Sequence, residues 1–256
     1  MRLHVHEWGN PVGRPVVCLH GVTAAGTRFK RLAEQRLGRF RVLAFDLRGH
    51  GDSEWEPPWT FDTLAGDVVE TLDALELADV AFVGHSLGGR LVLELAEFAP
   101  ERIERAALLD PSIQLLPHVA LDQAEGQRRD VVYGSLEEAV LERLTWNPQA
   151  PRKLIEEALA DELDRLPDGR LRTRYCHAAA VSIYGELAGP PPAPETMTVP
   201  TLLVYAPEYG LVHETQVEAY RTALGDKLKV VEVPGLHVVM WDAFEQVAMA
   251  LDDFLD

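Results

Sequence analysis

Ser86 and His237 are the two residues of this sequence whose types and settings best suit nucleophilic catalysis. Ser86 stands at the centre of Gly84-His85-Ser86-Leu87-Gly88, and His237 follows Pro234-Gly235-Leu236 in a glycine-containing loop late in the chain. A serine hydroxyl becomes a strong nucleophile when a base removes its proton. An imidazole titrates in the right range to be that base, and a carboxylate can fix its tautomer. The two residues are 151 positions apart, so only the tertiary fold can bring them together.

The segment around Ser86 predicts a strand, a tight turn and a helix. An apolar run at 80–83 precedes the pentapeptide, and apolar residues recur at helical spacing over 91–98. In this context Gly-x-Ser-x-Gly is typical of a nucleophile elbow, which holds the serine in a strained turn at the carboxyl end of a strand. Gly84 and Gly88 are needed there because a Cβ at either position would collide with neighbouring backbone.

A second loop supplies candidate donors for an oxyanion hole. The strand predicted at 15–19 ends in His20-Gly21-Val22, which turns backbone N–H groups toward the top of the sheet. We expect the amides of Val22 and Leu87 to be the two donors. We interpret His20 itself as a structural histidine that holds this loop by hydrogen bonds.

Strand and helix patterns alternate through most of the chain, which predicts an α/β fold with a mostly parallel central sheet. Strands are expected at 3–8, 15–19, 41–45, 80–83, 103–109, 201–205 and 228–233, and helices at 28–37, 61–75, 91–98, 214–224 and 241–254.

Residues 112–194 interrupt this alternation. They show no convincing strand, only helical stretches near 119–129, 136–144, 151–163 and 172–187. We therefore expect a core domain of residues 1–111 and 195–256, and a helical cap of residues 112–194 over the carboxyl edge of the sheet. Apolar faces of the cap are expected to supply the substrate pocket, and the candidate contacts are Trp146, His177, Val181 and Tyr184.

The composition narrows the class of partner. The chain of 256 residues carries 24 Lys and Arg against 41 Asp and Glu, a net charge of −17. This acidity argues against nucleic-acid and anionic-membrane partners, which select basic surfaces. Two cysteines make no disulfide framework, and we find neither a secretory leader nor an apolar run of membrane-spanning length. We expect a cytoplasmic monomer or homodimer that acts on a small molecule.

His4 and His6 lie on one face of the strand predicted at 3–8, because side chains alternate along a strand. Two histidines so spaced can begin a metal site, but the sequence places no third ligand beside them. We interpret them as exposed strand histidines, and we expect neither a metal ion nor a cofactor.

Four motifs, in this order, resemble the α/β-hydrolase family. They are His20-Gly21, Asp46-Leu47-Arg48-Gly49-His50-Gly51-Asp52-Ser53, Gly84-His85-Ser86-Leu87-Gly88-Gly89 and Gly235-Leu236-His237. They cover nearly the whole chain, and the helical insertion falls after the sixth strand of the family's usual count, where members carry their cap. The resemblance implies the α/β-hydrolase fold, with Ser86 as nucleophile and His237 as base. It does not define the substrate.

The acid of the triad departs from the family's pattern. Members most often carry an aspartate in the turn after the strand that is 201–205 here, and this chain has Ala206-Pro207-Glu208-Tyr209, with tyrosine at that place. Two carboxylates keep the required order of serine, acid and histidine. Asp110 ends the preceding strand, a location that some members use, and Glu208 is one position off in the later turn. We favour Asp110, with Glu208 as the alternative.

These inferences predict a carboxylesterase-like serine hydrolase that cleaves an ester or related acyl substrate through an acyl-enzyme. Serine at the elbow argues against the haloalkane dehalogenase and epoxide hydrolase branches of the family. Resemblance to either branch would require a carboxylate nucleophile at this position. A lactonase, a C–C bond hydrolase or a cofactor-free peroxidase-like enzyme would use the same triad. A ligand-sensing protein would keep the triad and the fold, and a degenerate hydrolase would keep the fold without activity.

Overall fold

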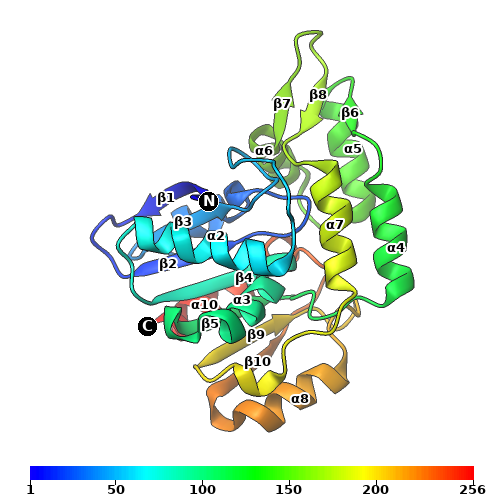
Figure 1. The fold of residues 1–256 in the computed structure, drawn as a ribbon. Coiled ribbons are helices and arrows are strands. Elements are labelled where there is room, and N and C mark those ends of the chain that lie inside the picture. The colour runs from blue at the N-terminus through cyan, green and yellow to red at the C-terminus, as the bar shows by residue number, and fades with distance from the viewer.

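The fold is built on a seven-stranded sheet, as a computed structural model of residues 1–256 shows (Figure 1). The strands are β1 (His4–Gly9), β2 (Pro15–Leu19), β3 (Arg41–Asp46), β4 (Val80–His85), β5 (Ile103–Leu109), β9 (Thr201–Tyr205) and β10 (Leu228–Glu232). Their order in the sheet is β1-β3-β2-β4-β5-β9-β10, and only β1 runs antiparallel to its neighbour. The predicted mostly parallel sheet is confirmed.

Both faces of the sheet are buried, which explains why its central strands are apolar without interruption. The covering helices are α1 (Lys30–Gln35), α2 (Phe61–Ala74), α3 (Leu87–Phe98), α8 (Glu214–Leu224) and α10 (Phe244–Leu255), with the short α9 (Val239–Asp242) before the last. Phe82 of β4 packs in the core that α2, α3 and α8 share, and Val83 packs in the core of α1 and α10. Alternate side chains of one strand therefore serve opposite layers.

The insertion between β5 and β9 was predicted to be entirely helical, and that prediction is wrong. Its helices are α4 (Pro117–Gly126), α5 (Leu136–Trp146), α6 (Arg152–Glu162) and α7 (His177–Leu187), and it also holds a small antiparallel sheet of β6 (Val132–Tyr133), β8 (Leu171–Thr173) and β7 (Leu163–Arg165). Strands of two or three residues are too short to show alternation. The segment Pro167-Asp168-Gly169 is the turn of a hairpin rather than a helix break, and Gly169 takes the positive φ of +88° that this turn requires.

The insertion lies beyond the carboxyl edge of the sheet (Figure 1) and packs on it in two ways. Helix α7 contributes Ile183 and Leu187 to the main core. Helices α5 and α6 form a small apolar cluster of their own, which includes Val238 and Trp241 from the segment after His237. The insertion therefore rests on the loop that carries His237. Its division from the core as a separate domain stays a prediction. No helix of the fold combines the length and apolarity needed to cross a bilayer.

Candidate active site

The strand order brings the candidate residues to one edge of the sheet. Ser86 follows β4, the middle strand, and the neighbours of β4 are β2 and β5. Val22 lies in the loop after β2 and Asp110 in the turn after β5, while His237 comes from the loop after β10. All four strands are parallel, so the loops at their carboxyl ends meet above β4.

Ser86 has a strained backbone conformation, in a turn that requires glycine at the neighbouring positions 84 and 88. Its φ of 56° and ψ of −115° lie outside the regions that residues with side chains usually adopt. A Cβ at Gly84 would stand 2.4 Å from the carbonyl oxygen of Gly88, and one at Gly88 would stand 2.0 Å from that of Leu19. Helix α3 thus approaches β4 at Gly84 and β2 at Gly88 too closely for any larger residue, as the sequence predicted.

Ser86, His237 and Asp110 form one hydrogen-bonded chain. His237 Nε2 lies 2.9 Å from Ser86 Oγ, and His237 Nδ1 lies 2.6 Å from Asp110 Oδ2. Asp110 is fully buried, and its Oδ1 accepts a hydrogen bond from the backbone N–H of Ala206 at 3.2 Å. Ser86 is 6% exposed.

Glu208, the alternative acid, does not join this chain. It is exposed and has no hydrogen bond to His237. The neighbouring Tyr209 instead stacks its ring on the imidazole of His237, with centroids 5.1 Å apart and planes at 15°. Tyr209 is 48% exposed, and partial burial, followed by the charge of Asp110, raises the pKa of its phenol.

Tyr209 and Ser112 are contacts of the array that sequence reasoning missed. Ser112 Oγ lies 3.1 Å from Ser86 Oγ, and the Ser112 N–H donates to the carbonyl of Ser86 at 3.0 Å. In the sequence, Tyr209 occupies the position at which the family usually has an aspartate, and Ser112 follows Asp110 and Pro111. The only available signal was proximity in sequence to a candidate acid.

The amides of Val22 and Leu87 are both free to bind an anion. Both residues are buried, and neither N–H donates a hydrogen bond within the protein. Leu87 is the first residue of α3, so its N–H has no acceptor inside the helix. Gly21 lies against the nucleophile, since a Cβ there would be 3.2 Å from the Cβ of Ser86. The loop after β2 therefore reaches the serine, as an oxyanion hole requires.

Two further histidines border the site, and both are structural. His20 donates from Nδ1 to the carbonyl of Gly21 at 2.8 Å and accepts at Nε2 from the Leu47 N–H at 3.0 Å, which confirms its expected role in holding the loop. Burial lowers the pKa of His20 to about 3. His85 donates from Nε2 to the carbonyl of His237 at 3.0 Å, and burial followed by the charge of His237 lowers its pKa well below the usual value.

Three of the four pocket residues predicted in the insertion lie on α7, and Trp146 lies apart from them on α5. Trp146 is 70% exposed at the end of α5, and His177 donates from Nδ1 to the carbonyl of Gln127 at 3.1 Å. Tyr184 packs against the main core, and Val181 is half-buried on the same helix. None of them hydrogen-bonds or stacks with Ser86, His237 or Asp110. Their part in binding substrate stays a prediction.

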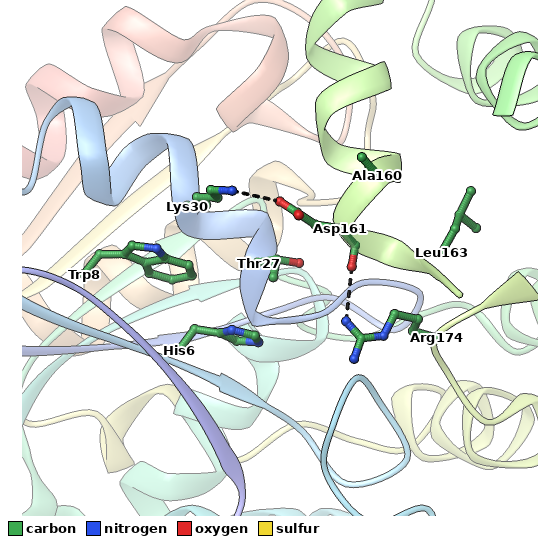
Figure 2. Close-up of a pocket in the computed structure, with 8 residues that line it drawn as sticks. All are labelled: His6, Trp8, Thr27, Lys30, Ala160, Asp161, Leu163 and Arg174. Carbon is green, nitrogen blue, oxygen red and sulfur yellow. Dashed lines mark hydrogen bonds and ion pairs between the residues drawn. The ribbon is translucent and has the colours of Figure 1, made fainter. Parts of the chain in front are cut away.

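A separate crevice of about 360 Å³ opens between β1, the 3-10 turn η1 (Gly26–Phe29) and the insertion (Figure 2). We name it the β1 crevice, and its lining residues are His6, Trp8, Thr27, Lys30, Ala160, Asp161, Leu163 and Arg174. It contains none of the residues of the Ser86 array.

Comparison of this sequence with known proteins identifies the same fold as the structure shows. Residues 14–148 match the α/β hydrolase fold family, and the chain belongs to that family. A lipase of Mycobacterium tuberculosis (strain ATCC 25618 / H37Rv), LipV, is 32% identical over 203 residues, which are 78% of this chain and 77% of the lipase. An esterase of Escherichia coli (strain K12), YbfF, is 32% identical over 96 residues, a match that spans only 38% of either chain.

Solved structures extend the likeness to the whole chain. The crystal structure of an E-2-(acetamidomethylene)succinate hydrolase superposes with a TM-score of 0.86 at 25% identity, covering 99% of this chain and 95% of that one. An enol-lactonase from Burkholderia xenovorans LB400 superposes with a TM-score of 0.78 at 22% identity, covering 99% and 96%, and this likeness shows the fold alone.

Proposed function

We propose that this protein is a carboxylesterase-like serine hydrolase, in which Ser86 is the nucleophile, His237 the general base and Asp110 the acid that orients it. The observation that carries the proposal is the unbroken chain of short hydrogen bonds from Ser86 Oγ through His237 to Asp110. The lipase and esterase names of its relatives support an ester as the substrate.

The reaction follows from the positions of these atoms. Ser86 Oγ attacks the ester carbonyl carbon while His237 Nε2 takes the hydroxyl proton, and the Asp110 carboxylate stabilises the imidazolium that results. The tetrahedral intermediate then collapses as its bond to the alkoxy oxygen breaks. His237 gives its proton to that oxygen, so the alcohol leaves and the acyl group stays bonded to Ser86. A water molecule, deprotonated by His237 in the same way, releases the acid and restores the serine.

The negative charge of the tetrahedral intermediate is stabilised by backbone donors. We assign this role to the amides of Val22 and Leu87, which are buried and unused within the protein. In serine hydrolases one such donor contributes about 3–4 kcal/mol to transition-state stabilisation. The positive end of α3, whose first residue is Leu87, favours the same charge.

The insertion is proposed to act as a cap that selects the substrate. Its apolar cluster packs on Val238 and Trp241, directly after the catalytic histidine, so its position can govern access to the serine. A lactone is a cyclic ester that the same triad would open, and lactones therefore belong in the first substrate panel beside linear esters.

The proposal is tested by hydrolysis of p-nitrophenyl butyrate across a range of pH. The wild-type rate is expected to rise through the range in which histidines lose their proton, and Ser86→Ala should abolish turnover without unfolding the chain. Ser112→Ala is the matched control, because it removes a hydroxyl that lies 3.1 Å from Ser86 Oγ and has no hydrogen bond to His237. This variant should keep activity within about tenfold of wild type. Turnover by folded Ser86→Ala above a few per cent of wild type would refute the assignment. A folded wild type that hydrolyses no ester or lactone would instead favour a ligand-sensing protein.

A further inference from the structure

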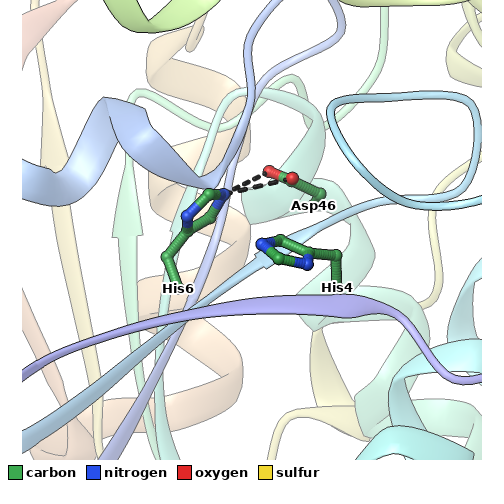
Figure 3. A group of neighbouring side chains, drawn as sticks. All are labelled: His4, His6 and Asp46. Carbon is green, nitrogen blue, oxygen red and sulfur yellow. Dashed lines mark hydrogen bonds and ion pairs between the residues drawn. The ribbon is translucent and has the colours of Figure 1, made fainter.

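A cluster of two histidines and an aspartate lies at the edge of the sheet, apart from the proposed triad (Figure 3). Antiparallel pairing of β1 with β3 sets His4 opposite Asp46, and His6 is two residues along on the same face of β1. His6 Nε2 is 3.1 Å from both Oδ1 and Oδ2 of Asp46, and one ligand atom of each of the three side chains lies within 4.8 Å of the others. Strand pairing thus supplies the third ligand that the sequence did not place.

The backbone holds the Asp46 carboxylate in a fixed position. The side chain is fully buried, with Oδ1 accepting from the Gly26 N–H at 2.7 Å and Oδ2 from the Asp52 N–H at 3.0 Å. Burial alone would raise the pKa of Asp46, but hydrogen bonds from His6 and Asp52 outweigh it and hold that pKa far below its ordinary value. Each oxygen of a carboxylate can accept twice, so each keeps one lone pair for the side that faces His6.

The loop around Asp46 and a tryptophan on the same strand as His6 orient two of these ligands in advance. Gly51 has a φ of +52°, and a Cβ there would stand 2.1 Å from Asp46 Oδ2, so the loop closes around the carboxylate. The ring of His6 stacks on Trp8, with centroids 5.6 Å apart and planes at 10°. Orienting contacts of this kind behind a ligand are what protein metal sites use to set ligand geometry.

The distances suit a shared cation. Tetrahedral ligands bonded to zinc at about 2.0–2.2 Å lie about 3.3 to 3.6 Å from each other, and His6 Nε2, at 3.1 Å from each Asp46 oxygen, needs only a small shift to reach that separation. His4 must move closer, and its side chain is free to do so because it is 41% exposed. A second carboxylate is at hand, since Asp52 pairs with Arg174 through Oδ1 and its other oxygen, Oδ2, lies 3.8 Å from His4 Nε2.

An ion can reach these side chains from solvent. His6 lines the β1 crevice (Figure 2), and the two cations on that crevice are already paired. Lys30 is paired with Asp161, and Arg174 with Asp52. An entering cation would therefore meet lysine and arginine side chains that are already paired, and the Asp46 carboxylate, whose side-chain partner is His6, itself a proposed ligand.

We propose that His4, His6 and Asp46 bind a divalent transition-metal ion of the Zn²⁺ type, with Asp52 as a further oxygen ligand. Two imidazoles with carboxylate oxygens form a donor set that suits zinc. The ion would tie the first strand to the end of β3 and to the loop after it. The site is structural in character, since none of its ligands hydrogen-bonds a member of the proposed triad.

The test is isothermal titration of the full-length chain, freed of any histidine tag, with Zn²⁺ alone. One ion per chain should bind, and His4→Gln and His6→Gln should each weaken binding at least tenfold. His118→Gln, which removes an exposed histidine of the insertion, is the matched control and should bind as wild type does. His237→Ala should also bind Zn²⁺ normally, which separates this site from the triad.

Thermal unfolding gives a second measurement that does not depend on activity. Zn²⁺ at a hundredfold excess over its Kd should raise the Tm of wild type by roughly 5–10 °C, and the Tm of His6→Gln by much less. The proposal is overturned if no stoichiometric binding is found, if binding survives both His4→Gln and His6→Gln, or if it is lost in His237→Ala. Circular dichroism of each variant without metal checks that loss of binding does not reflect loss of fold.

Discussion

Asp110→Asn should nearly abolish catalysis while leaving the shape of the site intact. Two donors converge on this carboxylate, His237 Nδ1–H at 2.6 Å and the Ala206 N–H at 3.2 Å, and each uses a different oxygen. Asparagine offers one acceptor oxygen and one NH₂ group in their place. If its oxygen faces Ala206, its NH₂ group meets Nδ1 and favours the tautomer with the proton on Nε2. His237 then cannot take the proton of Ser86.

If the amide oxygen faces His237 instead, the buried Ala206 N–H loses its acceptor, at a cost of about 1–3 kcal/mol. The protein should therefore favour the tautomer that is inactive. We expect kcat/KM to fall by about 10³–10⁴, which corresponds to about 4–5.5 kcal/mol of transition-state stabilisation, as for the same change in other serine triads.

The assay is kcat/KM for p-nitrophenyl butyrate, with a thermal melt to confirm that each variant is folded. Glu208→Gln is the control, because Glu208 is exposed and outside the hydrogen-bonded chain, and its activity should stay within about threefold of wild type. If Asp110→Asn keeps more than a tenth of wild-type activity, or if Glu208→Gln loses more than Asp110→Asn does, the acid is wrongly assigned.

Three other predictions concern the surroundings of the triad. Tyr209→Ala should lower kcat/KM for p-nitrophenyl butyrate about tenfold because the stacked ring on His237 is lost, whereas Tyr209→Phe should match wild type; equal losses in both would point to the hydroxyl. Gly88→Ala should cost about 3 kcal/mol or more in urea unfolding, since its Cβ would stand 2.0 Å from the carbonyl oxygen of Leu19, and a stable variant would contradict the packing. His20 has a folded pKa of about 3 against an ordinary 6.5, so only the unfolded chain binds its proton between these values, and stability must fall as pH falls through that window. Urea unfolding should show a loss of about 2 kcal/mol from this group between pH 6.5 and pH 5, and His20→Gln should remove that part of the slope.

The pattern of elements around Ser86 was predictable from sequence because strong local signals mark it. A buried strand, glycines that permit a close approach, and an apolar helix are each visible within a few residues of Ser86. The helix predicted at 214–224 also coincides with α8 (Glu214–Leu224), where apolar spacing is regular. The family, the fold and the mostly parallel sheet followed from such signals.

Features that depend on pairing between distant segments were harder to predict. The hairpin of β7 and β8 has three-residue strands, whose periodicity cannot be distinguished from that of a helix end. Asp46 could not be recognised as a neighbour of His4, because their pairing depends on the register of β1 against β3. The predicted pocket contacts rested only on apolar character, which suits packing as well as substrate, and Trp146 is largely exposed.

The strand order explains how the proposed acid can stand after β5. Strand β5 adjoins β4, so a carboxylate in the turn after β5 lies one strand from Ser86, and a residue after β9 lies two strands away. His237 comes from beyond both, and its loop carries Nδ1 past the turn after β9 to reach Asp110. That turn is then free to hold another residue, and Tyr209 occupies it with its ring against the imidazole. The missing aspartate after β9 and the tyrosine in its place are thus two parts of one arrangement, in which the imidazole is oriented from one side and covered from the other.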